Sequence, residues 1–291
     1  MPDTPQRLFC FGLGYSARAL ADAVRADGWT VAGTCRGEEK RAALQADGID
    51  AFIFDRAQPM DDPQAALAGT THLLLSVPPD AEGDAALDLH GEDIADCPGL
   101  QWAGYLSTTG VYGDRDGGWV DETSDRHPSG PRGERRVRAE DGWLDLHRMH
   151  GIPMHLFRLA GIYGPGRNAL ETVRSGRSRR VIKPDQVFSR IHRDDIVQVL
   201  RASMASPDPG TAYNLCDDEA APPQDVIAFA CDLLGVVPPP EIPFEEAELS
   251  PMGQSFYRDN KRVSNARIKE SLGVVLKWPT YREGLRGLLT P

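Results

Sequence analysis

The sequence predicts an α/β protein with a doubly wound parallel sheet and a smaller C-terminal substrate lobe. Three observations support this. Short apolar segments alternate with helical segments at the spacing of strand–helix–strand units. The segments are mostly apolar, as strands covered by helices on both faces are. They end in Gly, Ser, Thr or Pro. Because ligands bind such sheets at the carboxyl ends of the strands, we expect functional residues at those endings.

The predicted elements follow one another in a regular order. An apolar run from Arg7 to Phe11 precedes an Ala-rich helical stretch that extends to about Asp27. Leu73 to Leu75 mark a buried strand, and Gly273 ends the last predicted helix. Further strands are expected over 29–34, 50–54, 72–76, 102–107, 154–159 and 212–215, and helices over 38–47, 194–205, 222–234 and 264–272.

Composition limits the class of protein. The 291 residues are 41% hydrophobic and 26% charged, which is ordinary for a soluble globular protein. A net charge of −11 argues against nucleic acid or an anionic membrane as a partner. No apolar run approaches the ~20 residues that span a bilayer. The cysteines are scattered and lack metal-ligand spacing, so we expect a cytoplasmic protein without a metal site: Cys10, Cys35, Cys97, Cys216 and Cys231.

A glycine-rich turn lies between the first predicted strand and the first predicted helix. Glycines permit a tight turn there, backbone N–H groups can approach a pyrophosphate, and the helix N-terminus favours an anion. A small residue in the third glycine position suits helix–strand packing. We therefore predict a Rossmann-type dinucleotide site at Gly12, Gly14, Tyr15, Ser16 and Ala17. The alternative is a strand–helix turn that binds nothing.

The end of the second predicted strand distinguishes NAD from NADP. An acidic residue there would bind the ribose hydroxyls of NAD, whereas a cation favours the 2′-phosphate of NADP. The strand ends in Cys35-Arg36, and no acid occurs before Glu38. Arg36 therefore predicts NADP as the preferred cofactor, with NAD as the alternative. Arg36 could also be a solvated charge at the start of the next helix.

Two segments resemble signatures of a known enzyme family. Leu106 to Gly113, LSTTGVYG, is similar to the strand-end signature of the extended short-chain dehydrogenases/reductases, the NAD-dependent epimerase/dehydratase family. Arg158 to Arg167, RLAGIYGPGR, resembles that family's sixth strand and the segment after it. The resemblance implies that Thr108 orients the substrate, with Thr109 and Tyr112 among the substrate-binding residues. Thr108 could instead satisfy backbone groups at the strand end.

The same resemblance implies further cofactor contacts. Asp55 would meet the adenine, and Ser76, Val77 and Pro78 would lie along the pyrophosphate and ribose. Leu159 and Gly161 would border the nicotinamide. Asp55 could equally be a turn residue before the next helix.

The resemblance also suggests how the chain divides. Residues 1–160 and 193–230 are expected to form the NAD(P)-binding domain, and 161–192 and 231–291 the smaller substrate lobe. The polar, Gly- and Pro-rich segment from Asp114 to Gly133 is predicted to act as a lid.

The proton-transfer residues of the family are missing from their expected place. A Tyr and, four residues on, a Lys are expected at the start of the helix after the fifth strand, where this chain has Arg132 and Arg136. A guanidinium stays charged and has no acceptor, so Arg132 cannot transfer the proton. Arg136 could still supply a cation near the nicotinamide ribose. The Tyr257–Lys261 match to Tyr-x-x-x-Lys lies far past the sheet and is rejected. The candidate replacement donors are Tyr105, Tyr112, Tyr163, His192, Glu122 and a water molecule.

The segment from Arg167 to Arg193 holds eight cations and two acids in a chain of net charge −11. It predicts an anionic substrate, phosphorylated or nucleotide-linked, with Arg167 and Arg190 among the binding residues. A solvated face is an equal alternative. Phe188 stands where the nucleotide-sugar enzymes of the family carry a diphosphate-binding Arg, which puts a nucleotide sugar in doubt.

These observations predict an NAD(P)-binding oxidoreductase or epimerase-like protein with a non-standard proton donor. The alternative is a catalytically silent sensor of NADP(H). A homodimer paired through the helix that carries Arg136 is expected by analogy with the family.

Overall fold

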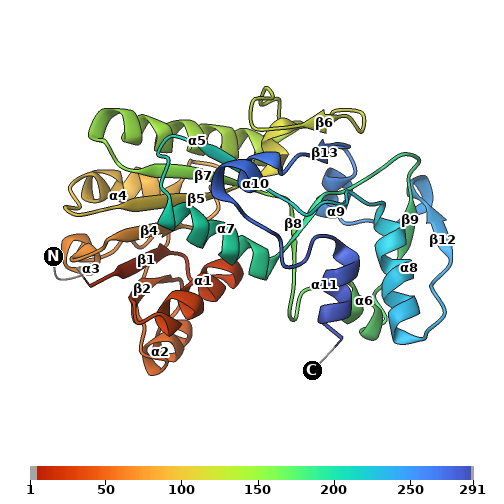
Figure 1. Cartoon of the computed structure of the whole chain (residues 1–291), viewed down its shortest axis with the longest axis horizontal. Helices are drawn as coiled ribbons and strands as arrows, with labels where there is room; N and C mark the ends of the chain where they lie inside the picture. Colours follow the sequence, from red (N-terminus) through yellow and green to blue (C-terminus); the bar gives the residue numbers. More distant parts are fainter. Residues whose placement is uncertain (1–4, 290–291) are drawn as a thin grey trace. The chain divides into compact units, whose positions relative to one another are not determined.

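The computed structural model describes residues 5–289. Its central sheet has seven strands in the order β11-β7-β5-β4-β1-β2-β3 (Figure 1). Strands from β3 to β5 pair in parallel, with Phe9 opposite both Ala32 and Leu73. The predicted α/β class with a doubly wound parallel sheet is therefore confirmed. The strands are β1 (Arg7–Phe11), β2 (Thr30–Cys35), β3 (Asp50–Ile53), β4 (His72–Leu75), β5 (Trp102–Thr108), β7 (Met154–Leu159) and β11 (Ala212–Leu215).

The chain divides into two compact units. Within the described residues, the first unit comprises 5–107, 134–157 and 200–213. The second comprises 108–133, 158–199 and 214–289. The predicted limits of the cofactor domain and the substrate lobe stay a prediction.

One face of the sheet in the first unit packs on a large apolar core. Phe9 and Phe11 of β1 lie in a cluster with Leu73, Tyr105 and Trp143, all of which are buried. Alternate residues of a strand point to opposite faces, so this cluster takes every second residue of β1. The helices that contribute to it are α3 (Pro63–Leu67), α4 (Ala85–Ala95) and the part of α5 (Pro131–His150) that belongs to this unit.

Other helices of the first unit are fastened by polar contacts. Trp102 of β5 donates from Nε1 to Ser203 Oγ at 3.0 Å. Arg201, two residues earlier in the same helix, pairs with Asp27 at 2.5 Å. These contacts place the end of α7 (Arg193–Ala205) beside β5 and α1 (Tyr15–Ala26), as Figure 1 shows; α2 (Glu38–Ala46) follows β2.

The predicted boundaries of five strands agree with the structure to within one residue. β1, β7 and β11 have the predicted limits, β4 ends one residue earlier than predicted, and β2 begins and ends one residue later. Helix α10 (Ala266–Leu272) ends as predicted at Gly273, whose φ of +63° is left-handed. No helix within residues 5–289 combines the length and the apolar character that crossing a bilayer requires.

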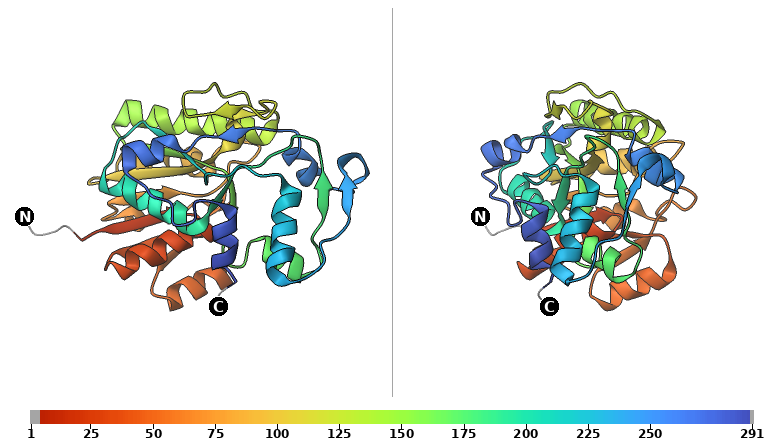
Figure 2. Two further views of the ribbon diagram at one scale, coloured as in Figure 1. Left: turned by 45° about the vertical axis from the view of Figure 1, so that its right-hand side comes forward. Right: turned by 90° about the vertical axis from the view of Figure 1, so that its right-hand side faces the viewer.

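The second unit has a smaller core and three two-stranded sheets. Tyr163, Leu170 and Tyr281 are buried together with residues of α8. Figure 2 shows α8 beside β9, which pairs in parallel with β12. The elements are η1 (Thr109–Tyr112), β6 (Trp119–Val120), β8 (Gly161–Tyr163), α6 (Ala169–Arg174), β9 (Arg180–Ile182), β10 (Arg190–His192), α8 (Pro223–Leu234), β12 (Glu241–Pro243), η2 (Phe244–Glu246), α9 (Pro251–Phe256), β13 (Arg262–Val263), α10 and α11 (Tyr281–Gly287).

The segment predicted to be a lid is fastened within the second unit. It contains β6, which pairs in parallel with β13 so that Trp119 lies opposite Arg262. The backbone N–H groups of Arg115 and Gly117 both donate to the carbonyl of Asn260, at 3.0 and 2.9 Å. These bonds fix the segment through its backbone, which argues against a lid.

Candidate dinucleotide site and reaction centre

The turn after β1 is tight and needs glycine at its first position. Gly12 has a φ of +86°, and its N–H donates to Thr34 Oγ1 at 2.8 Å. The next N–H group, of Leu13, donates to the Thr34 carbonyl at 2.9 Å. A Cβ on Gly12 would lie 3.0 Å from Val77 Cγ2. The turn is therefore held against the ends of β2 and β4, in a conformation that favours glycine.

The helix that follows this turn begins without a side-chain cap. Gly14 is the N-cap of α1, no side chain accepts a hydrogen bond from the first turn, and that turn holds no acidic residue. No capping side chain therefore competes with an anion at this helix end, and the helix dipole favours one. Ser16 and Ala17 are buried, so helix α1 can pack closely on the sheet. These features fit the pyrophosphate of a dinucleotide.

The residues at the end of β2 fit the predicted adenosine end of the site. Cys35 is buried and Arg36 is exposed. Glu38, the first acid, pairs with Arg41 at 2.7 Å. Arg36 makes no hydrogen bond or ion pair with another described residue. The Arg36 guanidinium is therefore available to a ligand.

Asp55 has the turn geometry that the sequence allowed. Its Oδ1 accepts hydrogen bonds from the N–H groups of Ala57 and Gln58, at 2.8 and 2.9 Å. This arrangement is an Asx turn, which Asp adopts without any ligand. After β4, the N–H of Ser76 donates to the Phe11 carbonyl at 2.9 Å. The first unit therefore joins Gly12, Ser76 and Val77 at one place, with Pro78 following them.

The predicted reaction-centre residues of the second unit serve the backbone. Thr108 Oγ1 accepts from the Gly110 N–H at 3.1 Å, which matches the alternative of a satisfied strand end. Thr109 Oγ1 donates to the Leu159 carbonyl at 3.5 Å. Gly161 donates its N–H to the Ser189 carbonyl at 3.1 Å. Each of these threonine hydroxyls therefore has a partner in its own unit.

The two arginines at the positions of the family's dyad have different surroundings. Arg132, in the second unit, is exposed, and its guanidinium lies over the Phe256 ring, 5.5 Å from the ring centre. Arg136, in the first unit, donates to the Tyr105 hydroxyl at 3.2 Å and to the Leu106 carbonyl. Arg136 thus binds the backbone of β5, and neither arginine presents an acceptor for a proton.

The three tyrosines named as replacement donors are buried, and burial raises the pKa of each. Tyr105 accepts the bond from Arg136. Tyr112 donates to Asn214 Oδ1 at 2.7 Å and accepts from Arg158 at 2.9 Å. The Tyr163 hydroxyl donates to the Thr280 carbonyl at 3.4 Å. A raised pKa makes proton release near neutral pH harder.

The two other named donors are also buried. His192 is 1% exposed, burial lowers its pKa to about 4, and its Nδ1 accepts from the Asp194 N–H at 3.1 Å. Burial raises the pKa of Glu122, whose Oε1 accepts from the Asn214 N–H at 2.7 Å. None of the five candidate proton donors is therefore an exposed residue: Tyr105, Tyr112, Tyr163, His192 and Glu122.

A polar network that sequence reasoning missed lies behind Tyr112. Arg158 donates to Tyr112, Tyr112 to Asn214, and the Asn214 N–H to Glu122. Glu122 also faces Arg267 at 3.8 Å. The network joins five places in the sequence that no shared spacing connects, so no signal could have found it. It fixes the Val-Tyr-Gly segment within the second unit.

Most of the predicted anion-binding cations have internal partners. Arg174 pairs with Glu171 and Arg180 with Glu241, at 2.7 and 2.6 Å. Arg179 and Lys183 donate to backbone carbonyl groups. These cations therefore hold the second unit together.

Arg190 and Arg167, the two cations named as substrate-binding, differ in exposure. Arg190 donates to the carbonyls of Phe188 and Ala221, at 2.7 and 3.1 Å, and its guanidinium lies over the Tyr281 ring. The Arg190 guanidinium, which the sequence suggested as a substrate-binding cation near Phe188, is therefore engaged in internal contacts. Arg167 is exposed.

Lys261 and the pair Asp194 and Asp195 both stabilise the second unit. Lys261 donates from Nζ to the Gly113 carbonyl at 2.7 Å, in the second unit, so its role there is to support the chain. Asp194 and Asp195 lie in the first turn of α7. Asp195 accepts from the N–H groups of Lys277 and Trp278, at 2.7 and 3.2 Å. The pair anchors a distant segment and does not cap the helix.

Comparison with known proteins finds relatives in sequence and in fold. No model of a protein family matches the chain. Protein YeeZ from Escherichia coli (strain K12) is 28% identical over 285 residues, which are 92% of this chain and 94% of YeeZ. A solved structure of UDP-glucuronic acid 4-epimerase from Bacillus cereus, in complex with UDP-glucuronic acid and NAD, is 15% identical, has a TM-score of 0.77 and is covered over 97% of both chains.

At that identity the epimerase establishes the fold alone, so NAD-dependent epimerases are among the structural neighbours of this chain. A conserved protein of unknown function from Silicibacter pomeroyi DSS has a TM-score of 0.90, with 98% of each chain covered. At 50% identity over that length, this protein and the Silicibacter pomeroyi protein belong to one family.

Proposed function

We propose that this chain binds a pyridine dinucleotide through its first unit, prefers NADP, and acts as a cytoplasmic oxidoreductase or epimerase-like enzyme on an anionic substrate. The observation that carries the proposal is the uncapped N-terminus of α1 after the left-handed Gly12. The NAD-bound epimerase of the same fold supports it. The bound dinucleotide would supply the hydride chemistry.

The proposal includes a reaction centre without the tyrosine of the family. Arg132 and Arg136 are proposed to stand in place of the Tyr and the Lys. Thr108 is proposed to position the substrate oxygen, because its hydroxyl accepts one bond and retains its proton to donate. The test is a screen of carbonyl and sugar substrates at the nicotinamide absorbance. No change with any anionic or neutral substrate would count against an enzyme.

The second candidate function is a catalytically silent sensor of NADP(H). Arg136 favours it, because its guanidinium is occupied by the Leu106 carbonyl and the Tyr105 hydroxyl. A sensor must bind the oxidised and reduced forms with different affinity, since a ligand without differential binding shifts no equilibrium. Equal dissociation constants for NADP and NADPH would remove this candidate.

Replacing Arg36 with aspartate tests the proposed cofactor preference. The variant is expected to bind NADPH at least tenfold more weakly, because it exchanges a cation for an anion beside the 2′-phosphate. NADH affinity should change less than threefold. Calorimetric titration of both dinucleotides measures the two effects.

A matched control makes the same change of charge elsewhere in the first unit. Arg148 lies in the last turn of α5, which ends just before β7 begins, and so at the amino edge of the strands. Arg148→Asp should leave NADPH affinity within about twofold. An Arg36→Asp variant with unchanged NADPH affinity would overturn the NADP assignment while leaving dinucleotide binding intact.

A further inference from the structure

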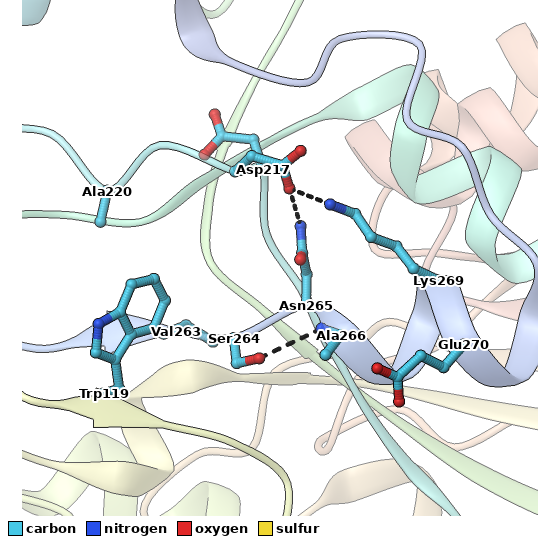
Figure 3. Close-up of a pocket in the computed structure, with 10 residues that line it drawn as sticks. Trp119, Asp217, Ala220, Val263, Ser264, Asn265, Ala266, Lys269 and Glu270 are labelled. Carbon is cyan, nitrogen blue, oxygen red and sulfur yellow. Dashed lines mark hydrogen bonds and ion pairs between the residues drawn. The ribbon is translucent and has the colours of Figure 1, made fainter.

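The second unit contains a cavity of about 310 Å³ that none of the predicted cofactor or substrate residues lines (Figure 3). It lies among β6, β13, the start of α10 and the loop after β11. Its volume is at the lower end of the range of small-ligand pockets. The cavity therefore has room for one small group.

Two of the charged side chains at the cavity neutralise each other. Lys269 pairs with Asp218 at 2.5 Å, and Asn265 Nδ2 donates to the same carboxylate oxygen at 2.6 Å. Both interactions are drawn in Figure 3. A third charged residue, Glu270, is exposed and makes no hydrogen bond or ion pair within the described chain. The cavity thus keeps a net negative charge.

A buried carboxyl group adds an acceptor without a partner. Asp217 lines the cavity and is only 3% exposed. Its Oδ1 accepts from the Glu219 N–H at 3.3 Å, whereas its Oδ2 has no hydrogen-bond partner among residues 5–289. A buried polar atom without a partner destabilises a fold. This oxygen lies beneath the surface of the cavity, so a ligand in the cavity does not reach it.

The opposite side of the cavity is aromatic. Trp119 of β6 is 67% exposed, which is unusual for so large an apolar side chain. Figure 3 shows its indole across the cavity from Asp217 and Glu270. An indole face attracts cations, and more strongly where solvent is partly excluded. The Trp119 ring and the Glu270 carboxylate thus both favour a cationic ligand.

We infer that this cavity binds an organic cation, a primary ammonium or guanidinium group, between the indole of Trp119 and the carboxylate of Glu270. The cation donates hydrogen bonds to the carboxylate oxygens of Glu270, while the ring stabilises its charge from the other side. A free amine and a lysine or arginine side chain of a protein partner share this chemistry. None of the residues of the proposed dinucleotide site lines this cavity.

Calorimetric titration of the full chain, without dinucleotide, tests the inference. The probes are n-butylammonium and n-butylguanidinium, with n-butanol as the uncharged analogue. At least one cation should bind saturably, one per chain, and at least tenfold more tightly than butanol. N-acetyl-lysine amide and N-acetyl-arginine amide separate the two sources: tighter binding than the alkyl cations favours a protein side chain, and weaker binding favours a free amine.

Variants locate the binding in the cavity. Trp119→Ala should weaken the cation at least tenfold, and Trp119→Phe less, because a benzene ring retains part of the attraction. Glu270→Gln should weaken it at least threefold. Glu245, an exposed glutamate of η2 outside the cavity, provides the control Glu245→Gln, which should bind as the parent chain does.

Three results would overturn the inference: no saturable binding of either cation, equal binding of butanol, or unchanged affinity in Trp119→Ala. Because Trp119 is largely exposed, its replacement should leave the circular dichroism spectrum intact, and Glu270→Gln gives an independent measurement. NADPH affinity should be the same in Trp119→Ala, and cation affinity the same in Arg36→Asp. Failure of one proposal is thereby distinguished from failure of the other.

Discussion

Replacing Gly113 with alanine is expected to lower the free energy of unfolding by at least ~3 kcal/mol. Gly113 follows the Val-Tyr pair at the end of η1, with φ +67° and ψ −155°. Residues other than glycine almost never adopt this combination of angles. A Cβ at this position would also lie 1.8 Å from the His127 carbonyl oxygen.

Relieving this clash requires a large rearrangement, because hydrogen bonds hold both Gly113 and the segment that contains His127. Lys261 holds the Gly113 carbonyl at 2.7 Å, and the Asp114 N–H donates to Ser129 Oγ at 3.1 Å. The atom that the new Cβ would meet belongs to the backbone and not to a flexible side chain. Strain and displacement therefore add.

Equilibrium unfolding in urea measures the effect, and a second glycine of the same segment is the control. Gly130 has no atom within 4 Å of a built Cβ. Gly130→Ala should change stability by less than about 1 kcal/mol, in either direction. A Gly113→Ala chain as stable as the parent would mean that residues 127–129 move away freely.

The sequence predicts those parts of the fold that depend on residues adjacent in the chain. Leu73 to Leu75 predict β4, because a parallel strand covered on both faces needs apolar side chains throughout. The turn at Gly12 is predictable for a similar reason, since the glycine and the helix it precedes are neighbours in the chain. Gly273 ends α10 through its own left-handed backbone.

Pairings between distant residues left no comparable pattern. β6 and β13 are two residues each, so neither strand has a period that a sequence could reveal. Their pairing fixes the segment from Asp114 to Gly133, which its composition alone had predicted to be a lid. The same holds for Glu122, which lies in a turn and whose partner Asn214 lies in β11. Long-range polar contacts are set by the fold and not by local propensity.

The cations of the second unit show why charge counts alone mislead. Eight cations and two acids between residues 167 and 193 suggested an anion site. Carbonyl groups and acids from later segments satisfy many of them, as with Arg180 and Glu241. A backbone carbonyl is a partner that no sequence displays. The exposed Arg36, by contrast, keeps its place in the candidate site because the structure gives it no such partner.

Asp217 is expected to make the protein less stable as the pH rises from about 4 to about 8. Burial raises the pKa of Asp217 from 3.8 to about 8 in the folded chain. Between these values the folded chain keeps a proton that the unfolded chain has lost. The free energy of unfolding therefore falls by up to ~1.4 kcal/mol per pH unit, on the order of 5 kcal/mol across the window. Below pH 4 and above pH 8 the group has the same protonation in both states, and its contribution to the slope ends.

Comparison with Asp217→Asn isolates this group from the others that titrate in the same range. His72 and His192, whose pKa values burial lowers to about 4, act with the opposite sign and cancel in the difference between the two proteins. Urea unfolding at pH 4 should give similar stabilities, because asparagine resembles the protonated acid. At pH 9 the asparagine variant should be the more stable by several kcal/mol, since the parent must then bury an ionised carboxylate.

Asp232→Asn, a change at an exposed residue of α8, should leave the pH profile of the parent unaltered. Parallel profiles for the parent and Asp217→Asn would show that Asp217 is ionised in the folded chain at neutral pH.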